Sequence, residues 1–271
     1  MTPQKLYLDL LKKALTFSLW EDPGYPIQAY SHLRRQPMRL IADVIAKTMA
    51  LGRMEVYRIR TDAQREEGLG WPRNADTMIG MKRLDNLQAC VEQVLADGIE
   101  GDLIETGVWR GGACIFMRGI LAAYGDTQRR VFVADSFQGL PPPDADKYPD
   151  DSGDVHYKFD HLRVSEDQVR HNFERYGLLD ARVVFLKGWF KDTLPTAPID
   201  KIAIMRLDGD MYESTMDALN ALYPKLSAGG YCLIDDYALE GCKKAVEDYR
   251  RQHGIESPIE TVDWTGAYWR K

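Results

Sequence analysis

The sequence lacks the long apolar runs of a membrane protein. No uninterrupted apolar stretch approaches the about 20 residues that a helix needs to cross a bilayer. Residues 1–5 lead into an amphipathic segment without the apolar core of a signal peptide. Hydrophobic residues make up 45% of the chain and charged residues 28%, as in ordinary globular proteins. We therefore expect a cytoplasmic protein without a membrane partner.

The chain also has few cysteines and carries no net positive charge. The four cysteines form no C-x-x-C pair and stand in apolar or helical contexts, which favours reduced core thiols over a disulfide framework or a zinc site. A net charge of −6 argues against a protein that binds duplex nucleic acid, because such proteins usually carry a basic face. The 271 residues are enough for one large α/β domain, alone or with an accessory segment. Nucleic acid is therefore not an expected partner.

Two short apolar runs each end in a cluster of aspartates. Residues 202–207 lead into Asp208-Gly209-Asp210, and residues 231–234 lead into Asp235-Asp236. Apolar runs of this length are typical of buried parallel strands. The intervening residues 214–225 have apolar side chains at helical spacing, which predicts a strand–helix–strand unit. The two strands of such a unit run parallel and are usually neighbours.

The four aspartates are therefore predicted to gather at the carboxyl edge of the sheet. This edge is where open α/β proteins bind their ligands. Like charges at such short range need either a cation or raised pKa values. A set of carboxylate oxygens suits Mg²⁺ or another hard divalent cation. A single aspartate at a strand end is more simply a solvated turn or cap residue, but two clusters on adjacent strands favour the cation site.

Strands and helices alternate from residue 76 to residue 271. This alternation predicts a doubly wound, Rossmann-like α/β sheet, in which a C-terminal hairpin adds an antiparallel strand at one edge. Gly229-Gly230 is the expected end of the helix 214–225. The predicted strands are 102–105, 131–134, 183–186, 202–207 and 231–234, the helices are 84–96, 113–124, 166–176, 214–225 and 238–253, and the hairpin is 259–262 with 266–269.

Residues 1–75 differ from the rest because they contain no convincing strand. Apolar side chains at helical spacing predict helices at 6–19 and 37–49, so this part is interpreted as a helical extension placed before the domain 76–271. These amphipathic helices could pack on the core or on a second copy of the chain, which leaves the oligomeric state open. Residues 141–160 are rich in Pro, Asp and Gly and predict a long loop that gates the site.

The first strand of the alternating region ends in a glycine-rich turn. Residues 105–112 read E-x-G-x-x-x-G-G, which permits a tight turn and a close approach of ligand to backbone, but departs from the G-x-G-x-x-G of dinucleotide binding. Asp135 ends the next strand, where an acidic side chain can bind both hydroxyls of a ribose. Together these features favour an adenosyl ligand without phosphates, such as S-adenosylmethionine. Trp189, after Gly188, could pack along the adenine or be a core aromatic.

Longer motifs extend this pattern over nearly the whole chain. They are 104–112 (IETGVWRGG), 134–137 (ADSF), 139–143 (GLPPP), 188–195 (GWFKDTLP), 206–215 (RLDGDMYEST) and 263–266 (DWTG). These motifs resemble the TylF/macrocin O-methyltransferase family, whose members methylate sugar hydroxyls in macrolide and aminocoumarin biosynthesis. The resemblance implies a class I methyltransferase fold that uses S-adenosylmethionine and Mg²⁺, or another hard divalent cation. It also implies that the helical extension is a lid over the cofactor.

The resemblance assigns roles to individual residues. Asp208, Asp235 and Asp236 match the metal ligands, and Asp210 matches the general base. The expected acceptor is a hydroxylated small molecule, a sugar-bearing natural product of antibiotic biosynthesis. The positions that match cofactor-binding segments are Thr77, Met78, Glu105, Thr106, Gly107, Val108, Trp109, Asp135, Ser136, Phe137, Gly139, Gly188 and Trp189.

Three alternatives remain open in the sequence. His156 and His161, in the region of the gating loop, are rival candidates for the base or for a substrate contact. A metal-dependent phenol or catechol O-methyltransferase would use the same fold and a similar set of carboxylates. A non-catalytic protein that binds S-adenosylmethionine could keep the fold, but it would have no need of the aspartates.

Overall fold

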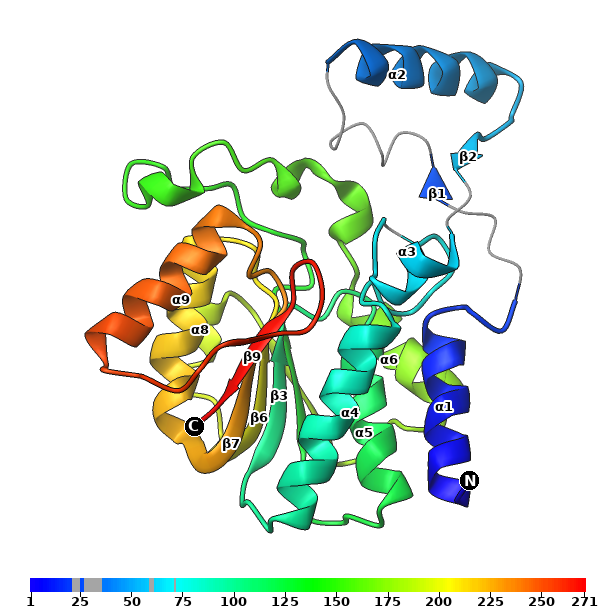
Figure 1. The fold of residues 1–271 in the computed structure, drawn as a ribbon. Helices are drawn as coiled ribbons and strands as arrows, with labels where there is room; N and C mark the ends of the chain where they lie inside the picture. Colours follow the sequence, from blue (N-terminus) through cyan, green and yellow to red (C-terminus); the bar gives the residue numbers. More distant parts are fainter. Residues whose placement is uncertain (21–24, 27–35, 59–60, 71) are drawn as a thin grey trace.

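A mostly parallel sheet with helices on both faces forms the centre of the protein (Figure 1). The computed structural model describes residues 1–20, 25–26, 36–58, 61–70 and 72–271. Within these residues the central sheet has seven strands in the order β5-β4-β3-β6-β7-β9-β8. They are β3 (Asp102–Thr106), β4 (Val131–Asp135), β5 (Val183–Lys187), β6 (Ile202–Leu207), β7 (Leu226–Ile234), β8 (Glu260–Thr261) and β9 (Ala267–Arg270).

The chain builds this sheet in two halves. It moves outward from β3 through β4 to β5, returns across the sheet to β6 and continues to β7, and all these neighbours pair in parallel. The strand β9 runs antiparallel between β7 and β8, so the C-terminal hairpin forms one edge. The direction of strand addition therefore reverses between β3 and β6, and open α/β sheets bind ligands at such a reversal. The predicted doubly wound fold with an antiparallel C-terminal strand is confirmed.

Each face of the sheet has its own hydrophobic core. Side chains alternate between the two faces along a strand, so Leu103 of β3 joins one core and Ile104 joins the other. The first core contains α1 (Pro3–Leu15), α4 (Met81–Ala96), α5 (Gly112–Ala123) and α6 (Glu166–Arg175). The second contains α8 (Tyr212–Leu222), α9 (Glu240–Gln252) and residues at and beside the short helix α7 (Phe190–Thr193).

The helix α5 positions the turn that follows β3. It is buried from Gly112 to Leu121, which explains why its sequence is apolar on every side except at Arg118, which pairs with Asp180. It begins after Gly111, whose φ of 84° lies in the left-handed region that favours glycine. A Cβ on Gly112 would lie 2.4 Å from the carbonyl oxygen of Asp76, so the start of the helix packs on the main chain that leads to α4.

The connection from α8 to β7 differs from the prediction. The helix α8 ends at Leu222, a 3-10 turn (Tyr223–Lys225) follows, and β7 already begins at Leu226. Gly229-Gly230 therefore lies inside β7, where the pairing with β6 shifts in register, and it does not end the helix. Gly229 has a φ of 85° and donates its N–H to the backbone oxygen of Lys271. A glycine pair is compatible with an irregularity inside a strand as well as with a helix end. Here the contacts with the neighbouring strands make it part of β7.

The N-terminal part is only partly separate from the sheet. The helix α1 buries Leu8, Leu11 and Leu15 in the first core, whereas α2 (Gln36–Leu51) stands apart from the sheet (Figure 1). Two short strands, β1 (Tyr25–Pro26) and β2 (Tyr57–Arg58), pair with each other, so the expectation of no strand in 1–75 is wrong there. A short helix, α3 (Asp62–Glu66), leads towards α4. None of the helices described is both long and apolar enough to cross a membrane.

Candidate functional site

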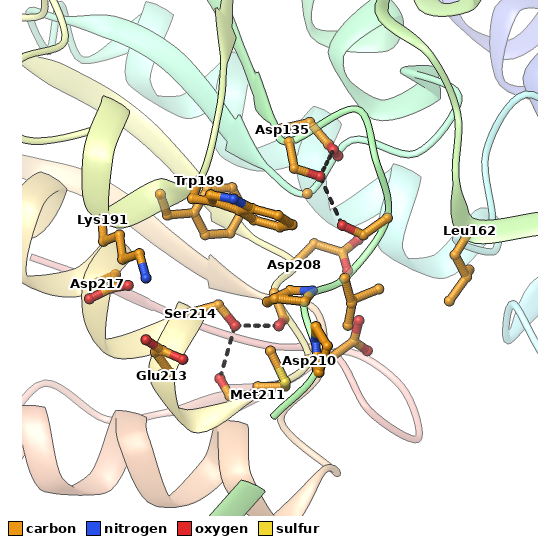
Figure 2. A pocket seen from close by; sticks show the side chains of 18 of the residues that line it. Asp135, Leu162, Trp189, Lys191, Asp208, Asp210, Met211, Glu213, Ser214 and Asp217 are labelled. Carbon is orange, nitrogen blue, oxygen red and sulfur yellow. Dashed lines mark hydrogen bonds between the residues drawn. The ribbon is translucent and has the colours of Figure 1, made fainter. Parts of the chain in front are cut away.

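A cavity of about 340 Å³ lies at the carboxyl ends of the strands, at the reversal point of the sheet (Figure 2). Asp135 and Asp208 border one part of it, and Lys191, Glu213 and Asp217 border another. The walls come from the chain before α4, the ends of β3, β4, β5 and β6, and the start of α8. They consist of Met78, Gly107, Trp109, Asp135, Ser136, Gly139–Pro142, Asp144, Leu162, Trp189–Lys191, Asp208–Met211, Glu213, Ser214 and Asp217.

The turn after β3 holds the carboxylate of Asp135 in this cavity. Gly107 has a φ of 80°, and a Cβ there would lie 1.6 Å from the carbonyl oxygen of Asp208, so only glycine fits. The N–H of Val108 donates to Asp135 Oδ2 over 2.8 Å, and the N–H of Phe137 donates to Oδ1 over 2.7 Å. Burial raises the pKa of Asp135, while the amide hydrogen bonds favour its ionised form. The ends of β3, β4 and β6 therefore meet around one carboxylate.

The wall also contains an indole held by two contacts. The N–H of the Trp109 ring donates to the backbone oxygen of His161 over 2.8 Å, and the guanidinium of Arg110 lies 4.2 Å from the ring centroid. Trp109 has a left-handed φ of 48° and nearby Phe137 has one of 57°. Such a backbone costs about 1–2 kcal/mol per residue, and strain of this kind concentrates at ligand sites. The local backbone therefore fits a binding site better than an ordinary turn.

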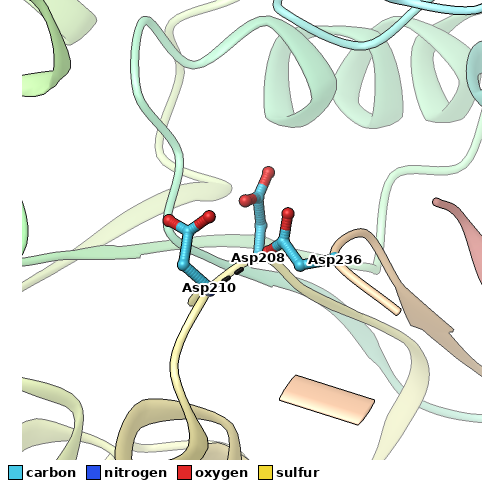
Figure 3. A group of neighbouring side chains, drawn as sticks. All are labelled: Asp208, Asp210 and Asp236. Carbon is cyan, nitrogen blue, oxygen red and sulfur yellow. Dashed lines mark hydrogen bonds between the residues drawn. The ribbon is translucent and has the colours of Figure 1, made fainter. Parts of the chain in front are cut away.

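Three aspartates project their carboxylates to the same side at the ends of β6 and β7 (Figure 3). One carboxylate oxygen each of Asp208, Asp210 and Asp236 lies within 4.8 Å of the other two. The parallel pairing of the two strands, with Leu207 opposite Ile234, brings them together. Asp210 has a left-handed φ of 59°, and its N–H donates to Asp236 Oδ2 over 3.1 Å.

Burial and mutual repulsion oppose the ionisation of these three groups. Burial, followed by the charges of neighbouring carboxylates, raises the pKa of Asp208 and of Asp236 well above the ordinary value. The same two causes raise the pKa of Asp210 to about 7. A cation placed between them would favour the ionised forms. Carboxylate oxygens grouped in this way suit a hard divalent cation such as Mg²⁺.

Asp235 lies in a different environment from the other three aspartates. Its Oδ2 is 2.5 Å from Arg83 Nη1, and its Oδ1 accepts a hydrogen bond from Arg206. Burial opposes its ionisation, but the two guanidinium groups outweigh burial and keep the pKa of Asp235 below the ordinary value. Arg206 also pairs with Glu105 and lies 3.0 Å from Asp208 Oδ2. Two buried arginines therefore neutralise part of the acidic cluster.

Known proteins share the sequence and the fold of this chain. The family profile described as macrocin O-methyltransferase (TylF) matches residues 4–271. The chain belongs to this family. It is 52% identical to the 8-demethyl-8-(2,3-dimethoxy-α-L-rhamnosyl)-tetracenomycin-C 4′-O-methyltransferase of Streptomyces olivaceus, over 98% of this chain and 92% of that protein. It is 45% identical to the mycinamicin III 3″-O-methyltransferase of Micromonospora griseorubida, over 100% of this chain and 98% of that protein.

A solved structure extends the likeness to three dimensions. The structure of the O-methyltransferase NovP is similar to this chain with a TM-score of 0.84 and 47% sequence identity, over 99% of both chains. The TylF-family chain is therefore a methyltransferase enzyme with a class I methyltransferase fold, and this fold implies S-adenosylmethionine as the cofactor. Membership in the family speaks against the non-catalytic alternative.

The structure of the TylF-family enzyme brings together part of the set predicted from the sequence. Nine of the predicted residues line the cavity: Met78, Gly107, Trp109, Asp135, Ser136, Gly139, Trp189, Asp208 and Asp210. The others are not part of its wall: Thr77, Glu105, Thr106, Val108, Phe137, Gly188, Asp235 and Asp236. Glu105 is buried and accepts from Arg206 and from the thiol of Cys114, and Val108 and Phe137 contribute backbone N–H groups.

The two rival histidines lie beside the cavity. His156 Nδ1 is 2.7 Å from Asp154 Oδ2, and this hydrogen bond, together with the charge of Asp210, raises the pKa of His156. His161 stacks on Phe159 and offers its backbone oxygen to Trp109. Neither side chain is part of the cavity wall.

Sequence reasoning missed the arginines of the TylF-family site. Arg206 is a charged residue inside an otherwise apolar strand, a pattern that by itself requires buried carboxylate partners. Arg83 and its second partner, Asp263, gave no such signal, because a polar residue on a helix or in a turn is by default exposed. Their burial depends on contacts between distant parts of the chain.

Proposed function

We propose that this protein transfers the methyl group of S-adenosylmethionine to a hydroxyl of a glycosylated natural product, with the help of a divalent cation. The observation that carries the proposal is that one cavity joins Asp135, where a ribose would bind, to Asp208 and Asp210, whose carboxylates gather with that of Asp236. A methyl donor held by the first part would present its reactive end towards the second. The name of one relative supports the sugar, because it contains a rhamnosyl group.

The residues around Asp135 have the properties that an adenosyl group requires. The Asp135 carboxylate would accept hydrogen bonds from the two ribose hydroxyls. Trp189 presents an aromatic surface to the same cavity and would pack along the adenine. Gly107, Met78 and Trp109 line the cavity in the same region. These contacts would fix the direction of the methyl group, which accounts for much of the rate in a transfer between two bound molecules.

The carboxylates fit a hard divalent cation, and Asp208 and Asp236 are ligands in either of two arrangements. The third ligand in the arrangement predicted from the sequence is Asp235. Both of its oxygens accept from arginines, but a carboxylate has about four acceptor positions, so one more contact is available. The third ligand by proximity is Asp210. We retain Asp235 as the ligand, which leaves Asp210 to act on the substrate.

The acceptor hydroxyl must lose its proton as its oxygen attacks the methyl carbon. S-adenosylmethionine would supply a methyl group bound to a sulfonium sulfur, and the C–S bond would break as the new C–O bond forms, with neutral S-adenosylhomocysteine as the leaving group. A divalent cation held by the aspartates would supply positive charge that lowers the pKa of a nearby hydroxyl. Asp210 lines the cavity beside Asp208 and accepts the proton in this proposal. Its left-handed backbone fixes its carboxylate beside that of Asp208.

Binding and turnover test the proposal separately. Titration calorimetry of the full chain with S-adenosylhomocysteine, with and without Mg²⁺, measures the cofactor and the cation sites. Incubation with glycosylated acceptors and S-adenosylmethionine should then give products heavier by one methylene in mass spectrometry. Asp208→Asn should remove most of the activity and weaken the binding of Mg²⁺. Asp97→Asn, which changes a carboxylate paired with Arg270 at the far end of α4, is the matched control.

The outcomes distinguish the alternatives. Full activity of the wild type in EDTA would remove the cation from the proposal. Methylation of phenols or catechols, but not of sugars, would replace the sugar acceptor by an aromatic one.

A further inference from the structure

Arg83 and Asp263 form a buried ion pair although 180 positions separate them in the sequence. Arg83 Nε lies 2.9 Å from Asp263 Oδ2, and Arg83 Nη1 lies 2.5 Å from Asp235 Oδ2. The Asp263 side chain is fully enclosed, and those of Arg83 and Asp235 are 9% exposed. Buried charges must be paired, so these contacts determine where each group lies.

The turn between β8 and β9 holds the carboxylate of Asp263 in place. Asp263 Oδ1 accepts the N–H groups of Thr265 over 3.0 Å and of Gly266 over 2.7 Å. The hydroxyl of Thr265 donates to the backbone oxygen of Asp235 over 3.0 Å. A Cβ on Gly266 would lie 2.9 Å from Arg83 Cδ, so the turn also encloses the aliphatic part of the arginine. One turn therefore contacts both Arg83 and the main chain of Asp235.

The same network reaches the cation site through Arg206. This guanidinium contacts Asp235 on one side and Asp208, over 3.0 Å, on the other. It also pairs with Glu105 in β3. A movement of Asp235 would therefore disturb Arg206 and, with it, the orientation of Asp208.

We infer that Arg83, anchored by Asp263, is a positioning residue that sets the geometry of the divalent-cation site. It acts on Asp235 directly and on Asp208 through Arg206. The inference rests on the proposed function, because it assumes that a cation binds beside Asp208. The indole of Trp264, the residue after Asp263, donates to the backbone oxygen of Glu67 over 2.8 Å. The turn that anchors Arg83 thus also contacts the N-terminal extension.

Asp263→Asn tests the inference with little change to the turn. The remaining side-chain oxygen can still accept the N–H groups of Thr265 and Gly266. The new NH₂ group, however, faces the Arg83 Nε–H. Because both groups are hydrogen-bond donors, the contact between residue 263 and Arg83 is lost. Loss of a group that orients metal ligands typically weakens metal binding about 10-fold or more. We expect the Kd for Mg²⁺, measured by calorimetry on the full chain saturated with S-adenosylhomocysteine, to rise by at least about 10-fold.

Arg83→Lys breaks the same contact from the other side. Lysine keeps the charge but cannot contact both carboxylates in the fork geometry of arginine, so it should raise the Kd for Mg²⁺ in the same way. The turnover number of both variants should recover as Mg²⁺ is raised, while KM for S-adenosylmethionine stays close to the wild-type value. Asp97→Asn should leave the Kd for Mg²⁺ unchanged.

Each other outcome counts against the inference. If both variants bind Mg²⁺ as the wild type does, the inference is wrong and the proposed function stands. A lower melting temperature with unchanged Mg²⁺ affinity would show that the pair only stabilises the fold. A wild-type protein that takes up no Mg²⁺ in the presence of S-adenosylhomocysteine would overturn the proposed function and the inference together.

Discussion

A Cβ on Gly107 would lie 1.6 Å from the carbonyl oxygen of Asp208, so the turn after β3 and the first aspartate after β6 touch through their main chains. We predict that Gly107→Ala lowers the free energy of unfolding by about 3 kcal/mol or more. The alanine adds strain at a φ of 80° and a clash that only a shift of the main chain can relieve. Urea denaturation measures the loss, and calorimetry with S-adenosylhomocysteine measures the accompanying loss of cofactor binding.

Gly125→Ala is the matched control for this prediction. Gly125 has a φ of 69°, but a Cβ there would meet nothing within 4 Å. Only the left-handed strain remains, which costs about 1–2 kcal/mol. Equal losses in the two variants would mean that the contact with Asp208 has no effect of its own.

Asp210 and Asp235 should differ in what their replacement changes. Asp210→Asn removes the proton acceptor of the proposed reaction, so we expect kcat to fall by about 100-fold or more. S-adenosylhomocysteine should still bind to this variant, because Asp135 and Trp189, which hold it in the proposal, are unchanged. Asp235→Asn should instead raise the Mg²⁺ concentration that gives half-maximal activity. The reverse pattern, with Mg²⁺ binding lost in Asp210→Asn, would make Asp210 the third ligand.

The buried Arg206 should be essential to stability. Arg206→Met removes the charge that neutralises Glu105 and Asp235, and breaking such a buried pair costs about 3–5 kcal/mol. The deficit in unfolding free energy should narrow as the pH falls, because the two carboxylates then take up protons. Arg270→Met, which breaks a partly exposed pair with Asp97, should cost less than about 1 kcal/mol. A similar loss in the two variants would contradict this role.

The strands that reach the site could be predicted because each has a local signal. A short, mostly apolar run that ends in Asp or is followed by it predicts a buried strand and its end, and the order of such units along the chain predicts a doubly wound sheet. The aspartates at the ends of β6 and β7 could be placed together for the same reason. Their positions follow from the pairing of adjacent strands rather than from any distant contact.

The features that escaped prediction depend on distant contacts. Gly229-Gly230 has the local sequence of a helix end, but the backbone of Lys271 and the side chain of Ile99 lie against Gly229 and make it part of a strand. The pairing of Asp235 with Arg83 was equally impossible to predict from the sequence. Arg83 pairs with Asp235 rather than with Asp236 because α4 and the C-terminal turn pack against the end of β7.

The pair formed by Asp154 and His156 should give the protein a pH-dependent stability. The hydrogen bond to Asp154 and the charge of Asp210 raise the pKa of His156 above 6.5. Burial alone would raise the pKa of Asp154, but the hydrogen bond and the charge of His156 outweigh burial and lower that pKa below 3.8. Both groups are therefore charged between pH 3.8 and pH 6.5, where the pair contributes fully. Above this range His156 loses its proton, and below it Asp154 gains one. The difference in unfolding free energy between wild type and Asp154→Asn should follow this curve, whereas a difference that is flat with pH would exclude an ionic pair.

The helix α1 should behave as part of the main cooperative unit, although it belongs to the segment 1–75 that the sequence separates from the domain. Leu15 is fully buried against the core that contains α5, so Leu15→Ala should cost about 2–5 kcal/mol in urea denaturation. Leu10 lies on the same helix but is 52% exposed, and Leu10→Ala should stay within about 0.5 kcal/mol of the wild type. Fluorescence and circular dichroism should report a single transition for both variants. A separate transition at lower urea concentration in Leu15→Ala would instead show that α1 unfolds independently of the main domain.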